Sequence, residues 1–244
     1  VALMTFILIF SSVTMVLAVD AGHNMNKSKV AFYMLLTIIG GAVFVGSQAW
    51  EWKNFIKGEY GALETRGGQI LQFVNSDTGK RASIRDFSKS IPTERSTHVK
   101  NKGIWFFSES SLPTVSLLEV KEGFKSNSNL LIRTEYLDDN GQKIILSREE
   151  SLNIIEQAQM VVEGANLIRN EYGNRLFANF FFFITGFHGF HVFSGVVINI
   201  IIFFNILIGT YERRGHYEMV EKVGLYWHFV DLVWVFVFTF FYLV

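Results

Sequence analysis

The chain has 244 residues, of which 50% are hydrophobic, with 25 Phe and only 2 Pro. This composition is too apolar and too aromatic for an ordinary soluble domain of that length. The net charge is zero, which argues against a nucleic-acid partner, and the chain has no cysteine for disulfides or thiolate metal sites.

Four apolar stretches are each long enough to cross a bilayer as a helix, which takes about 20 residues. The first two cover residues 1–19 and 30–50. The third, residues 176–211, has no charge and would be about 54 Å long, so part of it must tilt or extend beyond the membrane. The fourth covers residues 223–244 and contains one acid, Asp231. We expect four transmembrane helices.

Residues 1–19 share some features with a signal peptide, but they lack a basic segment at the start and their apolar run is too long for one. The sequence begins with Val1, already inside that run. We therefore expect the sequence to start partway through a longer protein.

Two short loops carry the basic residues that lie outside the central part of the chain. Residues 20–29 and 212–222 together contain five of them: Lys27, Lys29, Arg213, Arg214 and Lys222. With four membrane crossings both loops fall on one side, which the positive-inside rule makes cytoplasmic. We expect the central part and the C-terminus to be periplasmic.

Residues 53–175 carry most of the charges and are predicted to form a soluble α+β domain inserted between the second and third helices. Alternating apolar and polar residues at 69–74 and 130–136 predict strands. The DDNG segment at 138–141 is typical of a hairpin turn, and the apolar residues 144–146 follow it. About 120 residues suffice for a small hydrophobic core.

The last part of the inserted domain, residues 147–168, is predicted to be a helix. The residues there follow helical spacing: Leu152, Ile155, Ala158 or Gln159, and Val162. Ser147 or Ser151 is expected to cap its first turn.

No catalytic motif is visible in the inserted domain. It contains a single histidine, His98, and no HExxH, GxSxG or phosphate-binding loop. Its charges are best explained as a solvated surface. The functional alternative is a docking surface for an electron carrier.

The third and fourth apolar stretches contain ionisable residues at membrane depth. His188 and His191 are three positions apart and share one helix face, and His228 precedes Asp231 by three. Such groups are costly in lipid, so they normally find partners. The histidines could be axial haem ligands. Alternatively, they and Asp231 could hydrogen-bond to one another and to backbone carbonyls, beside glycines that allow close helix packing. A proton relay is the third alternative. Spacing alone leaves these alternatives open.

Two motifs closely resemble subunit III of haem–copper cytochrome c oxidases: residues 181–195 (FFFITGFHGFHVFSG) and residues 226–236 (YWHFVDLVWVF). Residues 48–52 (QAWEW) resemble the Gln and Glu at the end of that family's preceding helix. The helix before it has a small-polar pattern, which is matched here by Ser11, Ser12, Thr14 and Ala18. The resemblance covers the apolar helices, about half of the chain.

The resemblance implies an all-α polytopic membrane fold, with the four helices matching the last four of seven, interrupted by the inserted α+β domain. The expected organisation is a helix pair at 1–52, the insertion at 53–175 and a second pair at 176–244. No catalytic, cofactor-binding or metal-ligating residue is expected in this chain, because haem and copper belong to partner subunits. The buried polar network would comprise His188, His191, His228, Asp231 and Glu51.

The resemblance implies that this chain is a non-catalytic subunit III of a proton-pumping cytochrome c oxidase in a bacterial inner membrane. Its partners would be oxidase subunits I and II and phospholipid, and it would support turnover and proton uptake. Two alternatives stay open. Related quinol oxidases share these helices, and an integral b-type cytochrome would bind haem through the histidines. A transporter is disfavoured because no repeat of broken helices is visible.

The chain departs from the family pattern in three places. Asn205 stands at the position near the inner end of the third helix where a basic residue is expected. Arg213 and Arg214 follow about two turns later and are candidate lipid headgroup contacts. The family helix with a membrane-embedded glutamate would precede Val1. Residues 53–175 replace a short connection, and we expect them to shape a docking surface for a c-type cytochrome or a neighbouring respiratory complex.

Overall fold

The computed structural model describes residues 2–89, 97–98, 112–113 and 115–243. The chain divides into two compact units. The first unit combines both ends of the chain, residues 1–53 and 180–244, and the second consists of residues 54–179.

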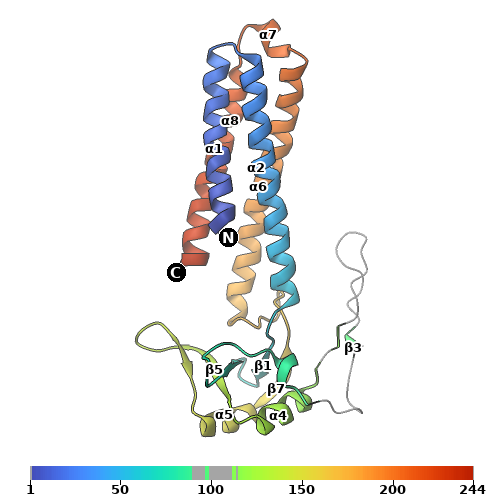
Figure 1. The fold of residues 1–244 in the computed structure, drawn as a ribbon, viewed down its shortest axis with the longest axis vertical. Helices are drawn as coiled ribbons and strands as arrows, with labels where there is room; N and C mark the ends of the chain where they lie inside the picture. Colours follow the sequence, from blue (N-terminus) through green and yellow to red (C-terminus); the bar gives the residue numbers. More distant parts are fainter. Residues whose placement is uncertain (1, 90–96, 99–111, 114, 244) are drawn as a thin grey trace. The chain divides into compact units, whose positions relative to one another are not determined.

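The first unit consists of four long helices (Figure 1): α1 (Ala2–His23), α2 (Lys27–Lys57), α6 (Arg175–Leu207) and α8 (Glu218–Phe238). A π-helical turn, Thr239–Leu243, extends α8. All four helices are long and apolar enough to cross a membrane. The prediction of four membrane helices is confirmed in this sense, and α1 and α2 extend beyond the apolar stretches from which they were predicted.

The third apolar stretch, residues 176–211, is not a single helix. α6 ends at Leu207, Gly209 adopts a φ of 76°, and the short helix α7 (Thr210–Arg214) follows. A left-handed residue ends the regular hydrogen-bonding pattern of an α-helix, and glycine adopts that conformation without a Cβ clash. α6 still has 33 residues, about 50 Å, and is longer than a hydrocarbon core of about 30 Å.

Glycines of α6 allow aromatic rings from other helices to lie against its backbone. A Cβ on Gly195 would lie 2.9 Å from Trp227 Cζ3, and a Cβ on Gly186 would lie 2.8 Å from Trp52 Cη2. Both distances are shorter than van der Waals contact, so a larger residue would push the ring away. A Cβ on Gly189 would meet nothing within 4 Å. The expected close packing therefore holds at two of these three glycines.

The two short basic loops lie at the same end of the first unit, as predicted. Lys27 Nζ is 3.2 Å from Glu212 Oε2. A Cβ on Gly22 would lie 3.0 Å from Tyr217 Cβ, so the chain segments touch there as well. Figure 1 shows α7 beside the turn that joins α1 and α2. The assignment of this end to the cytoplasm stays a prediction.

The second unit is built on a five-stranded antiparallel sheet with the order β6-β5-β2-β1-β7. Its strands are β1 (Ala62–Thr65), β2 (Ile70–Asn75), β5 (Leu130–Leu137), β6 (Lys143–Ile145) and β7 (Ala158–Val162). The helices are α3 (Ile84–Phe87), α4 (Leu117–Ser126) and α5 (Arg148–Ile155), and a separate ribbon pairs β3 (Thr97–His98) with β4 (Leu112–Pro113). The prediction of an inserted α+β region is confirmed.

The predicted hairpin joins β5 to β6. The Asp138 N–H donates to Gln142 O (2.7 Å), and Asp138 Oδ1 accepts from the N–H groups of Asn140 and Gln142. Gly141 takes a φ of 76°, which glycine tolerates best. The strands predicted at 69–74 and 130–136 correspond to β2 and β5 and are confirmed.

The helix predicted over residues 147–168 is only partly correct. Ser147 is the N-cap, with a capping box to Glu150, but α5 ends at Ile155. Residues 158–162 form β7, which pairs antiparallel with β1. Pairing satisfies backbone groups along the edge of β1, which local spacing does not reveal. Ser151 is no cap; its buried hydroxyl accepts from the Ile132 N–H (3.1 Å).

Candidate functional site

Small polar residues of α1 accept hydrogen bonds from the indoles of α8. The Trp227 Nε1–H donates to Ser11 Oγ (3.1 Å), and the Trp234 Nε1–H donates to Thr5 Oγ1 (3.0 Å). Thr14 and Thr37 join α1 to α2 through their hydroxyls at 2.8 Å. In a bilayer such bonds hold helices together because lipid offers the polar groups no alternative partner.

His228 and Asp231 of α8 both face Ser12 of α1. Ser12 Oγ lies 2.6 Å from His228 Nδ1. The same hydroxyl is within hydrogen-bonding reach of the Asp231 carboxylate, whose Oδ1 is buried without a partner in the described part of the chain. One serine therefore connects the two ionisable side chains.

His188 is buried between aromatic rings. Its Nε2–H donates to Val230 O (3.1 Å), and its ring lies 5.0 Å from that of Trp234 and 5.7 Å from that of Phe44, centroid to centroid. His191 instead bonds within its own helix, from Nδ1 to Phe187 O (2.8 Å). Thus one histidine joins α6 to α8, and the other lies at the bundle surface.

Glu51 joins the end of α2 to the C-terminal turn. Glu51 Oε2 accepts from Gln48 Nε2 (2.9 Å) and from the Tyr242 hydroxyl (3.0 Å). The adjacent Trp52 Nε1–H donates to Thr185 Oγ1 of α6 (3.0 Å). The QAWEW segment therefore makes the polar contacts between α2, α6 and the end of the chain.

The five residues of the predicted polar network are distributed over separate contacts. His228 and Asp231 share Ser12, whereas His188 and His191 bond to backbone carbonyls and Glu51 bonds to Tyr242. Among the described residues, no group of three or more His, Asp or Glu side chains gathers as a metal ion would require. Apart from that of His191, which lies within α6, these contacts join one helix to another.

The second unit has its own buried acid, Glu171, where the chain enters and leaves the sheet. Its carboxylate accepts from the N–H groups of four residues: Glu59, Tyr60, Gly61 and Gly164. Next to it, Tyr172 stacks on Phe55 with ring centroids 4.7 Å apart. Burial raises the pKa of the Tyr172 hydroxyl. We call this group of residues the neck, because it fastens the segment after α2 to the segment before α6.

Arg81 covers the neck. Its guanidinium lies 4.3 Å from the centroid of the Tyr60 ring. Burial lowers the pKa of Arg81, and nearby Arg133 lowers it further. Burial likewise lowers the pKa of Lys143, whose ammonium donates to Tyr172 O (2.9 Å). These cations occupy structural positions around the neck.

Arg213 and Arg214, the candidate headgroup contacts, end the short helix α7 and are exposed. Asn205, which stands at the position expected for a basic residue, donates to Ile201 O of its own helix (2.9 Å). The arginines are therefore available at the loop end of the first unit, and phospholipid binding there stays a prediction.

The C-terminal part of the chain is similar to known proteins. Residues 160–244 match the model of the family described as cytochrome c oxidase subunit III. The chain is 40% identical over 79 residues to cytochrome c oxidase subunit 3 of Thermostichus vulcanus, covering 30% of this chain and 37% of that protein. It is 33% identical over 129 residues to the Synechocystis protein of the same name, covering 48% and 54%. A probable subunit 3 of Rickettsia conorii is 39% identical over 74 residues, covering 30% and 26%.

Residues 160–244 of this chain are therefore similar to cytochrome c oxidase subunit III. The matched segment contains α6, α7 and α8, and therefore four of the five residues of the predicted polar network and both candidate headgroup arginines. The chain spans about half, or less, of the length of these relatives. Most of the inserted sheet lies before the subunit III match.

Sequence reasoning identified the ionisable residues of the helices but not all of their partners. Tyr242, the partner of Glu51, is 191 positions away and had no signal of its own. Ser12 belonged to the small-polar pattern, which indicated helix contacts but did not predict the hydrogen bond to His228. Glu171 was missed because a single acid among polar residues is typical of a surface.

Proposed function

We propose that this chain acts as a non-catalytic subunit III of a proton-pumping haem–copper cytochrome c oxidase. The observation that carries the proposal is the family match over α6 and α8, the helices that contain the His and Asp residues. Haem and copper would reside in partner subunits, as the similarity to subunit III implies. The chain would support the catalytic subunit and its proton uptake.

The apolar outer face of α6 supports contact with the catalytic subunit and with phospholipid. Phe183, Phe187 and Phe190 are 71%, 63% and 65% exposed and follow one another at helical spacing. Such a stripe needs an apolar neighbour, which subunit I or the lipid around the oxidase would provide. At the loop end, Arg213 and Arg214 would bind phospholipid headgroups.

The proposed location is a bacterial inner membrane, with the helix pairs at 1–52 and 176–244 spanning it. The loop end, with Lys27 and Arg213, would face the cytoplasm by the positive-inside rule. The insertion, residues 53–175, and the C-terminus would then face the periplasm. There the insertion would shape the docking surface for a c-type cytochrome or a neighbouring respiratory complex.

The test is a reduced-minus-oxidised optical spectrum of material purified through a tag on this chain. We expect a haem signal that leaves with a large co-purifying subunit when a harsher detergent separates the chains, so that the released chain is colourless. A haem band retained by the isolated chain would contradict the proposal, and His188→Ala and His228→Ala would then show whether these residues are the ligands.

A further inference from the structure

The second unit exposes an apolar tip. Leu167 and Ile168 are 70% and 69% exposed. Their turn is closed by Asn166, whose N–H donates to Arg169 O (2.8 Å) and whose Oδ1 accepts from the N–H groups of Ile168 and Arg169 (each 2.8 Å). An asparagine that closes a turn on both sides holds it in one conformation. Two large apolar side chains are thus held out from the surface.

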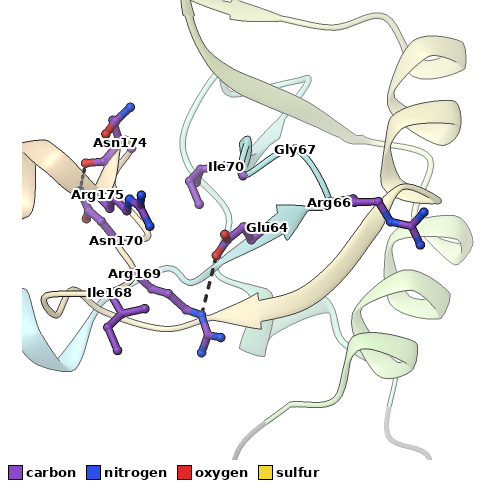
Figure 2. A pocket seen from close by; sticks show the side chains of 11 residues that line it. Glu64, Arg66, Gly67, Ile70, Ile168, Arg169, Asn170, Asn174 and Arg175 are labelled. Atoms are coloured by element: carbon purple, nitrogen blue, oxygen red, sulfur yellow. Dashed lines mark hydrogen bonds and ion pairs between the residues drawn. The ribbon is translucent and has the colours of Figure 1, made fainter.

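A polar pocket of about 410 Å³ borders this tip (Figure 2). Its lining includes Ile168, Glu64 and the three arginines Arg66, Arg169 and Arg175. Figure 2 shows Arg169 and Arg175 on the side of Ile168 and Arg66 at the other end. The ion pair from Arg169 Nε to Glu64 Oε2 is long, at 3.8 Å. Three cations against one acid favour an anionic ligand.

Arg175 belongs both to this pocket and to α6. It is the first residue of α6, a candidate membrane span, and the next charged residue along the chain is Glu212. Leu176 and Phe177 directly after it are 56% and 45% exposed, so the apolar surface of α6 begins at once. A cation that flanks a spanning helix lies at the level of the lipid headgroups.

We propose that the pocket and the tip form a membrane-interface site for the phosphate of an anionic phospholipid headgroup. Arg169 and Arg175 donate to the phosphate oxygens, which a planar guanidinium binds with two parallel hydrogen bonds. Leu167 and Ile168 insert at the boundary between headgroups and acyl chains. A free phosphate would leave this tip without an apolar partner, which is why the site is assigned to a lipid. The inference rests on the membrane embedding in the proposed function but not on assembly with oxidase subunits.

The position of the tip can be measured by site-directed spin labelling, because the chain has no cysteine of its own. The full chain with Ile168→Cys, labelled and placed in nanodiscs of phosphatidylcholine and phosphatidylglycerol, is studied by power-saturation EPR. We expect oxygen to relax the label more strongly than a water-soluble nickel chelate does. Leu137→Cys, at a residue 61% exposed at the end of β5, should report water, and Phe187→Cys on α6 should report hydrocarbon.

The two control sites separate the ways in which this measurement can fail. Water contact at residue 168 with hydrocarbon contact at residue 187 overturns the lipid site and leaves membrane embedding intact. Water contact at both sites overturns the embedding as well. A label at residue 168 that is in water in nanodiscs but immobilised when partner subunits are present makes the tip a protein contact, which also overturns the lipid site.

The headgroup contact is tested by native mass spectrometry of the full chain released from the same nanodiscs. We expect Arg169→Ala with Arg175→Ala to raise the Kd for phosphatidylglycerol about tenfold or more, because two cations near the bilayer surface are lost. Lys80→Ala, which removes an exposed cation elsewhere on the unit, should leave the Kd unchanged. Unchanged lipid retention in the double variant, or displacement of the lipid by inorganic phosphate, would overturn the site.

Discussion

At the residue scale, Glu171 shows how one buried charge can organise a junction. Its carboxylate is fully buried and is held by backbone N–H groups just before β1, at residues 59–61, and just after β7, at residue 164. A carboxylate with this many donors is well compensated for its loss of hydration. A neutral isostere cannot accept from all of them, because one of its two polar atoms is a donor.

Glu171→Gln is expected to destabilise the second unit by about 2–4 kcal/mol, because two buried backbone N–H groups lose their acceptor at a cost of roughly 1–3 kcal/mol each. The measurement is amide hydrogen exchange of the full chain, with faster exchange expected at residues 59–61 and 164. Glu122→Gln, at an exposed acid on α4, is the matched control and should exchange like the parent. Equal protection in the two variants would remove Glu171 from this role.

At the element scale, helix packing depends on which glycine faces a ring. Gly195 and Gly189 both lie on α6, but a Cβ at Gly195 would meet the Trp227 ring, whereas a Cβ at Gly189 would meet open space. The same substitution by alanine changes helix propensity equally at both positions. A difference in stability between the two variants therefore reports side-chain packing.

Gly195→Ala is expected to destabilise the first unit by about 1–3 kcal/mol, since the buried Trp227 ring must move. Gly189→Ala should be neutral, or stabilising by up to about 1 kcal/mol through helix propensity. Thermal unfolding of each full-length variant in detergent measures the difference. The packing argument would be contradicted if both variants unfolded at the same temperature.

The element scale also shows where local pattern misleads. Ser147 and Glu150 form the capping box that the sequence indicated, and α5 starts there. The residues from Ala158 to Val162 fit helical spacing equally well, yet they pair with β1. In the β1–β7 pairing, Ala62 lies 100 positions before its partner Val162, so no window of local sequence contains the deciding partner.

At the scale of the whole molecule, the strand pairing of the insertion allows most of it to be deleted while the helices are kept. Ala62 and Val162 are paired across β1 and β7, and the neck residues lie outside these two positions. A short turn can therefore replace residues 63–161 while the neck's backbone donors and Glu171 stay in the chain.

Replacing residues 63–161 by Asn-Gly is expected to leave assembly and the haem spectrum of the purified oxidase intact. The KM for cytochrome c should rise severalfold, because the proposed docking surface is lost. Turnover with a small artificial electron donor is the control and should not change. An unchanged KM with cytochrome c would show that the insertion does not dock the electron carrier.

The sequence by itself determined the four membrane helices, the common end of the two basic loops and the presence of an inserted α+β region. These follow from hydropathy, charge and short-range turn chemistry, which act within a few residues of one another. Only the tertiary structure decided that Ser12 joins His228 to Asp231, that Tyr242 meets Glu51, and that Glu171 fastens the neck. Each of those contacts unites groups far apart along the chain, and their free energy depends on burial and direction that no local pattern encodes.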